Sequence, residues 1–129
     1  MEPLIKVIGA KALIYLRYPE DIYSLASMLS VGLQLPEFRV ETRESPPHDL
    51  TGMAEALGWE VWLDHTDAVR SFQYSLAMET SNVQELLDKS QMYDLSPWLA
   101  KYVSRICKVD AFVGGTKIVF CRGIAKQMD

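Results

Sequence analysis

Residues 58–67, GWEVWLDHTD, concentrate side chains that often carry out catalysis. Asp64 directly precedes His65, and a carboxylate that orients an imidazole beside a hydroxyl is the arrangement of a catalytic triad. Neighbouring residues of a strand, however, point to opposite faces of the sheet, so Asp64 is badly placed to orient His65. His48, in a proline-rich segment, is a second histidine that the fold can bring in. A small enzyme that uses His65 or His48 with a carboxylate is therefore the alternative function.

The other motifs that could hold a metal, a phosphate group or a cofactor are incomplete. VGGTK at 113–117 lacks the frame of a phosphate-binding loop and is explained by a hairpin turn. Cys107 and Cys121 lack the CxxC spacing of zinc and redox sites, and we expect two buried, reduced thiols, with a disulfide between them as the alternative. The sequence therefore predicts no metal site, no cofactor and no catalytic residue.

The composition is that of a globular chain. A length of 129 residues fits one domain, which we expect to span residues 1–129. The apolar fraction of 49% and the charged fraction of 23% are typical of folded proteins. No apolar run approaches the ~18 residues of a membrane span, and no cleavage site follows the apolar residues near the N-terminus. These features predict a cytoplasmic protein that does not enter a membrane.

Charge is unevenly distributed along the chain, although the net charge is only −4. Residues 37–94 hold twelve Asp/Glu and four Lys/Arg, whereas residues 95–129 hold six Lys/Arg and two Asp/Glu. The acidic middle argues against nucleic acid as the main ligand, because phosphate binding needs clustered cations. Tyr102 and Phe112 lie among the basic residues of 101–126, but those cations also fit the solvent side of an amphipathic helix. The pattern favours a basic protein as the partner, and an ordinary solvated surface is the alternative.

Hydrophobic spacing predicts the order of helices and strands. One helix is expected to open at Pro19 and to end near Gly32, and another to run from Ser96, as its N-cap, to about Lys108. We expect strands at 12–18, 38–44, 59–65 and 72–79, a hairpin at 109–122, a short helix from residue 81, a strand or a helical turn at 53–57, and a frayed tail at about 123–129.

This order predicts an α+β fold. Alternation of apolar and polar residues at 38–44 and 59–65 is typical of a sheet with one face in water. We therefore expect a two-layer sandwich, in which a mainly antiparallel sheet of about five strands carries its helices on one face. A ferredoxin-like or related arrangement is the nearest template.

The strand at 59–65 separates two kinds of side chain. Val61, Leu63 and His65 share the apolar side, while a tryptophan between two carboxylates faces outward. A hairpin with 72–79 adds further carboxylates at its turn and on its second strand. A large aromatic anchor among charges is typical of a binding hot spot for a basic partner, unless the chain itself covers the tryptophan. The predicted partner-binding residues are Glu60, Trp62, Asp64, Asp67 and Glu79.

In general type, the chain resembles the immunity proteins of bacterial polymorphic toxin systems, including contact-dependent growth inhibition. GWEVWLDHTD, SLAMET and the acidic balance of residues 37–94 carry the resemblance. It implies a small acidic α+β domain that binds one cognate toxin, often a nuclease, and blocks its active site or a neighbouring surface. No family motif matches residue by residue, so the resemblance assigns no functional residue.

Three function classes follow. The first is a non-catalytic protein that binds a basic partner, most concretely a toxin-neutralising immunity protein. The second is the small enzyme described above. The third is a ligand-sensing or dimerisation module whose outward sheet face pairs with a second copy. The fold class is compatible with all three, so the choice depends on the site.

Overall fold

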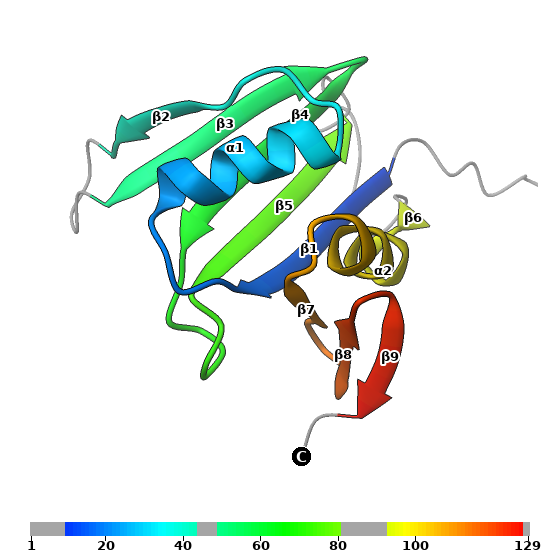
Figure 1. The fold of residues 1–129 in the computed structure, drawn as a ribbon. Coiled ribbons are helices and arrows are strands. Elements are labelled where there is room, and N and C mark those ends of the chain that lie inside the picture. The colour runs from blue at the N-terminus through cyan, green and yellow to red at the C-terminus, as the bar shows by residue number, and fades with distance from the viewer. Residues whose placement is uncertain (1–9, 44–48, 81–92, 128–129) are drawn as a thin grey trace, which may run out of the picture.

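The structure is a computed structural model that describes residues 10–43, 49–80 and 93–127. Within these ranges, two helices and nine strands form an α+β fold (Figure 1). In chain order the elements are β1 Ala10–Arg17, α1 Ile22–Gly32, β2 Arg39–Thr42, β3 Leu50–Ala56, β4 Trp59–His65, β5 Tyr74–Thr80, β6 Tyr93–Asp94, α2 Ser96–Ile106, β7 Asp110–Val113, β8 Ile118–Cys121 and β9 Ile124–Gln127.

One sheet contains all the described strands. Its order is β2-β3-β4-β5-β1-β7-β8-β9, with β6 paired to β1 off this path. Every pair is antiparallel except the short β1–β6 pair. The predicted α+β class and mainly antiparallel sheet are confirmed, but the expected number of about five strands is wrong. The extra strands are mostly short pieces in segments that contain turn signals.

The element order differs from the ferredoxin-like template. That template places two strands between its helices, whereas five strands of the described residues lie between α1 and α2. Strand β1 lies inside the sheet, between β5 and β7. It therefore joins the strands β2–β5 to the strands β7–β9. The predicted hairpin of β4 and β5 and the hairpin of β7 and β8 are both present.

The main core lies between the sheet and both helices. One cluster of buried residues combines the inward side chains of β1, β4 and β5 with the apolar faces of α1 and α2, so both helices cover the same face of the sheet. Burial of this apolar surface supplies most of the driving force for folding. The most deeply buried members include Ile14, Leu16, Ile22, Leu25, Leu29, Val61, Leu63, Leu76, Leu99 and Val103.

Both helices begin at other residues than expected, the first later than Pro19 and the second at Ser96 itself. Asp21, rather than Pro19, precedes the first helical residue, and its carboxylate accepts the N–H of Ser24 at 2.8 Å. Ser96 is the first residue of α2 rather than its cap. Its hydroxyl accepts the N–H of Leu13 at 2.9 Å and so ties α2 to β1. The side chain of Ser96 therefore bonds to the sheet and does not cap its own helix.

Two further segments depart from the expected pattern. Phe72 precedes β5 and packs with Phe112 and Val119 in a second, smaller cluster, not in the main core. Residues 124–127, expected in a frayed tail, form β9, because Arg122 and Gly123 adopt the positive φ angles of a tight hairpin turn. The short helix expected from residue 81 lies outside the described residues. No helix of the described ranges is long and apolar enough to span a membrane.

Asp94 and α2 allow a prediction about pH. The backbone N–H of Ser96 (2.9 Å) and its hydroxyl (2.5 Å) both donate to Asp94, and these bonds lower the pKa of Asp94 below its ordinary 3.8. A lowered folded-state pKa contributes stability above the unfolded pKa, and this contribution is lost as pH falls through the folded pKa. We expect Asp94→Asn to reduce the free energy of unfolding at pH 7 by less than about 1 kcal/mol, because Asp94 is exposed and asparagine keeps an acceptor oxygen. Urea unfolding from pH 7 to pH 3 should show this difference shrinking, and a difference independent of pH would contradict the assignment.

Candidate functional site

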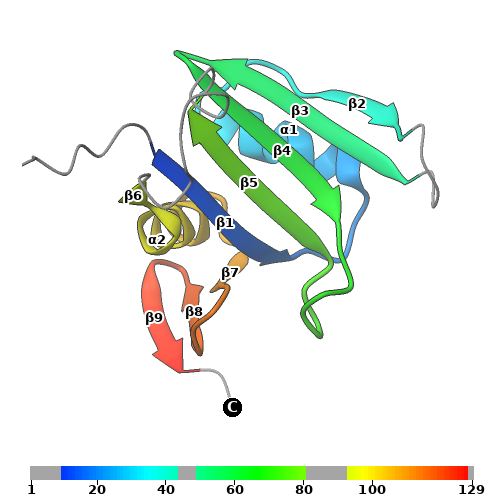
Figure 2. The ribbon, with the colours of Figure 1, turned by 180° about the vertical axis from the view of Figure 1, so that it is seen from behind.

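The sheet face opposite the helices carries most of the predicted site, and we call it the open face. Figure 2 shows this face, with β3, β4 and β5 in front of α1. On β4, Glu60, Trp62 and Asp64 alternate with Val61 and Leu63, which are fully buried beneath the helices. The outward tryptophan and carboxylates therefore lie on the same face, as the alternation predicts.

Trp62 is the centre of an apolar row that crosses four strands. It lies opposite Met53 of β3 and Ala77 of β5, and Leu13 of β1 lies opposite Ala77 on the far side. Trp62 is partly exposed and belongs to neither apolar core cluster, and Leu13 is 43% exposed. We call Met53, Trp62, Ala77 and Leu13 the apolar row. The sequence patterns did not single out Leu13 or Met53, because the place of each in the row depends on pairing with other strands.

A row of glutamates runs beside the apolar row. Glu55, Glu60 and Glu79 lie directly opposite one another on β3, β4 and β5, and Lys11 of β1 follows Glu79. Like charges directly opposite each other on neighbouring strands are unfavourable for folding. Lys11 partly offsets the charge of Glu79 at one end of this row, whereas Glu55 and Glu60 lie directly opposite each other.

Asp64 lies on the other side of Trp62 and already has partners within the chain. The hydroxyl of Thr51 donates to its carboxylate at 2.5 Å, and a guanidinium nitrogen of Arg43 lies 3.6 Å from the same oxygen. These contacts hold Asp64 on the open face, away from His65. Asp64 therefore does not orient His65, and Arg43 partly offsets its charge.

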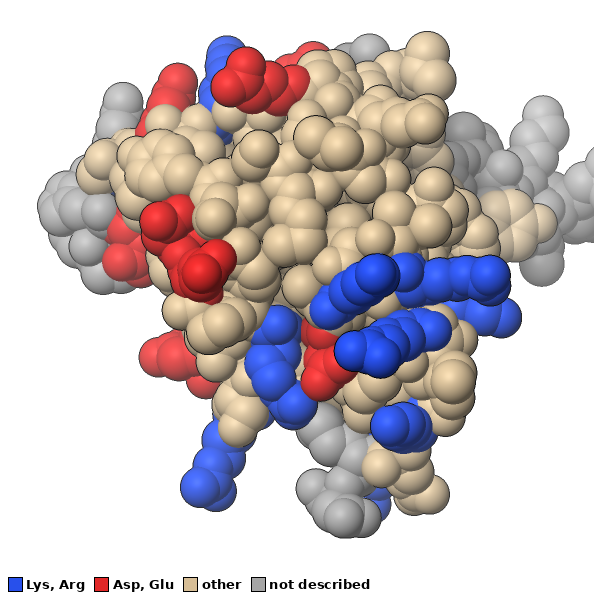
Figure 3. Space-filling model, viewed as in Figure 1, with Lys and Arg blue, Asp and Glu red and all other residues tan. Residues whose placement is uncertain are grey.

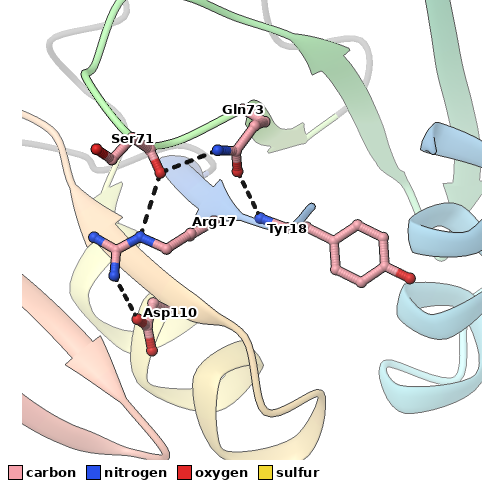
Figure 4. Close-up of polar contacts among 5 residues, drawn as sticks. All are labelled: Arg17, Tyr18, Ser71, Gln73 and Asp110. Atoms are coloured by element: carbon pink, nitrogen blue, oxygen red, sulfur yellow. Dashed lines mark hydrogen bonds and ion pairs between the residues drawn. The ribbon is translucent and has the colours of Figure 1, made fainter. Parts of the chain in front are cut away.

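Asp67 lies away from the apolar row, in the loop that joins β4 to β5. It is exposed, and internal contacts anchor the loop at the end nearer β5 (Figure 4). Arg17 donates to the carbonyl of Ser71 at 3.3 Å and forms an ion pair of 2.9 Å with Asp110. The side-chain oxygen of Gln73 accepts the backbone N–H of Tyr18 at 2.8 Å. The structure thus brings four of the five predicted residues onto one face and places Asp67 at its end.

His65 faces the apolar side of β4 at the strand end, as expected, but it is exposed to solvent. Its ring lies 4.6 Å from the ring of Tyr74, measured between centroids. Burial, above all, raises the pKa of Tyr74, whose hydroxyl donates to the carbonyl of Glu20 at 2.6 Å. The hydroxyl of Tyr74 therefore has a structural role. A hollow of about 390 Å³ is lined by His65, Thr66, Asp67 and Asp49, which is the one place where a histidine and two carboxylates share a surface among the described residues.

The remaining groups with possible chemical roles are not assembled into a site. Cys107 is buried and Cys121 partly buried, both are free thiols, and burial raises the pKa of each. Such thiols are weak nucleophiles near neutral pH. Within the described ranges, no group of three His, Cys, Asp or Glu side chains is arranged to hold a metal ion. His48 lies outside the described residues.

A hollow of about 510 Å³ opens at the β1 end of the apolar row. Leu13 and Ala77 continue the row into it, Glu79 and Asp94 contribute carboxylates, and the Gly114–Gly115 turn borders it. A Cβ atom on Gly114 would lie 3.0 Å from the ring of Tyr15, so a larger residue at this position would crowd that ring. The open face therefore combines an apolar row, flanking carboxylates and a recess that can receive a side chain.

Comparisons with protein-family models, with curated proteins and with solved structures give no match to this chain.

Proposed function

We propose that this chain is a non-catalytic protein that binds a basic protein partner through its open face. The single observation that carries the proposal is the strand register, which aligns Trp62 with Met53, Ala77 and Leu13 between carboxylates on both sides. Protein interfaces concentrate their binding energy in a few large aromatic residues surrounded by polar groups that exclude water. Acidic surroundings select a basic partner and accelerate its approach.

The most concrete form of this function is an immunity protein that neutralises a cognate toxin in the cytoplasm. A toxin that cleaves nucleic acid needs a basic surface to bind phosphates, and an acidic protein face is complementary to such a surface. Glu60 and Glu79, on one side of the apolar row, and Asp64, on the other, supply this charge. Trp62 supplies the anchor, and Asp67 extends the acidic surface at the loop end.

Co-expression with the product of the adjacent gene tests this function. If that product is a toxin, we expect the two proteins to co-purify and growth to be rescued when this chain is present. The matched variant is the same chain with Glu60→Lys, which reverses one charge on the open face and leaves the core unchanged. It should weaken both co-purification and rescue. Neither co-purification nor rescue by the wild-type chain would exclude the immunity function.

The hollow beside His65 favours a second candidate, a small enzyme that uses this histidine with Asp67 or Asp49. The imidazole is exposed and both carboxylates border the same 390 Å³ space. An activity screen on wild type and His65→Ala separates this candidate from the binding function. Loss of an activity in His65→Ala would support the enzyme, whereas toxin rescue by His65→Ala at the wild-type level would support binding alone.

A further inference from the structure

The outer side of α2 carries aromatic and basic side chains in alternation. Leu99, Ala100 and Val103 form the buried side of this helix. Trp98, Lys101, Tyr102 and Arg105 follow one another at the i, i+3, i+4 and i+7 spacing of a single helical stripe, and all four are exposed. We call these four residues the α2 stripe. It lies on the helix side of the molecule and shares no residue with the open face.

The two aromatic residues of the α2 stripe form a stacked pair in solvent. The ring centroids of Trp98 and Tyr102 are 5.7 Å apart, and the ring planes differ by 19°. Trp98 is 57% exposed and Tyr102 is 39% exposed, so each offers aromatic surface to a ligand. Planar groups in water gain free energy by stacking on such a platform, and nucleic-acid bases are the common biological case.

The cations around this pair are concentrated on one end of the molecule. Figure 3 shows Lys and Arg side chains gathered over the α2 and β8–β9 end. The exposed basic residues there are Lys101, Arg105, Lys108, Lys117, Arg122 and Lys126. Asp110 is the one carboxylate between residues 95 and 127, and its 2.9 Å ion pair with Arg17 offsets its charge. The local charge is therefore strongly positive although the whole chain has a net charge of −4.

The hairpin of β8 and β9 is held against α2, and this fixes the basic surface. Gly123 donates its N–H to the hydroxyl of Ser104 at 2.9 Å. A Cβ atom on Gly123 would lie 3.1 Å from the Cβ atom of Arg105, so the hairpin turn contacts the α2 stripe directly. Arg122 precedes Gly123 in this turn and is exposed. At physiological salt, exposed charges more than about 8–10 Å apart are largely screened from one another.

We infer that the α2 stripe and the neighbouring cations of β8–β9 bind single-stranded nucleic acid, with phosphates on the cations and an unstacked base on the Trp98–Tyr102 pair. An acidic protein would satisfy the cations, but it would leave the stacked aromatic platform without a planar partner. Duplex nucleic acid keeps its bases stacked inside the helix and therefore uses the cations alone. The inference is independent of the proposed function, because it involves the other side of the molecule.

Fluorescence anisotropy with a labelled fifteen-nucleotide oligo-dT tests the inference on the full chain. We expect binding in the micromolar range at 50 mM salt, and a loss of about twentyfold at 200 mM salt if about three phosphates are neutralised. Trp98→Ala should weaken binding to oligo-dT by about fivefold or more, but should leave binding to a duplex of equal length unchanged. Lys101→Glu combined with Arg105→Glu should weaken both ligands.

Matched controls separate specific binding from general charge effects. Tyr23→Ala removes another 57% exposed aromatic residue, on α1, and Arg39→Glu with Arg70→Glu changes the net charge equally away from α2. Both controls should bind oligo-dT within about twofold of wild type, since neither touches the site. The absence of oligo-dT binding at 50 mM salt would overturn the inference. Equal losses of oligo-dT affinity in the control variants would also overturn it. So would binding of poly-glutamate that Trp98→Ala weakens as strongly as it weakens oligo-dT binding.

Discussion

Trp62→Ala combined with Glu60→Lys is expected to weaken binding of the proposed basic partner by several hundredfold. Removing a central aromatic anchor costs about 2 kcal/mol or more, and a reversed charge against a basic surface adds about 1–2 kcal/mol. Each 1.4 kcal/mol corresponds to about tenfold in Kd. Titration calorimetry with a partner identified by co-expression measures the change, and wild-type affinity in the double variant would place the interface elsewhere.

Glu60 is a better position for the charge reversal than Asp64. Asp64→Lys would break the hydrogen bond from Thr51 and place a cation beside Arg43, so a loss of binding would be mixed with a loss of stability. Glu60 instead lies between Glu55 and Glu79, where a lysine meets carboxylates on both neighbouring strands. We expect Glu60→Lys alone to raise the free energy of unfolding by roughly 0.5 kcal/mol.

A control on the helix side makes this result specific. Tyr23→Ala with Glu37→Lys applies the same two types of change to exposed residues of α1 and the segment before β2. This variant should bind the partner with nearly wild-type affinity. If it loses affinity as severely as the open-face variant, general charge governs binding and the open face has no special role.

Local sequence patterns predicted those features of the site that depend on a single strand or hairpin. The alternation in β4 is strict, because one of its faces is buried by the helices and the other meets solvent. The hairpin of β4 and β5 followed from two alternating runs with a short connection, and it placed Glu79 next to Glu60 correctly. These inferences needed no knowledge of the remaining chain.

Features that depend on pairing between distant segments were beyond the sequence patterns. Leu13 joins the apolar row only because β1 pairs with β5, across more than sixty residues of chain. Met53 lies in a segment whose small residues fit a strand or a helical turn equally well, and pairing with β2 and β4 decides for the strand. Phe72 has the spacing of an inward strand residue, yet it packs with Phe112, because the loop before β5 crosses to the other face.

Leu63→Ala and Trp62→Ala provide the strongest test that the two faces of the sheet differ. Leu63 is fully buried among the residues of the main core, so its truncation leaves a cavity and should lower the free energy of unfolding by about 2–5 kcal/mol. For a domain of this size, we expect a fall in melting temperature of about 10 °C or more. Trp62 is the adjacent residue on the same strand, but it points to the open face and belongs to neither core cluster.

We therefore expect Trp62→Ala to cost no more than about 1–1.5 kcal/mol, despite the larger side chain that it removes. Thermal unfolding of both variants, followed by circular dichroism, measures the contrast directly. A protein uses a partly exposed tryptophan at low cost to stability only where its own core does not need it, which is the condition for an anchor that awaits a partner. If Trp62→Ala proves as destabilising as Leu63→Ala, Trp62 is a core residue, and the docking function of the open face must be abandoned.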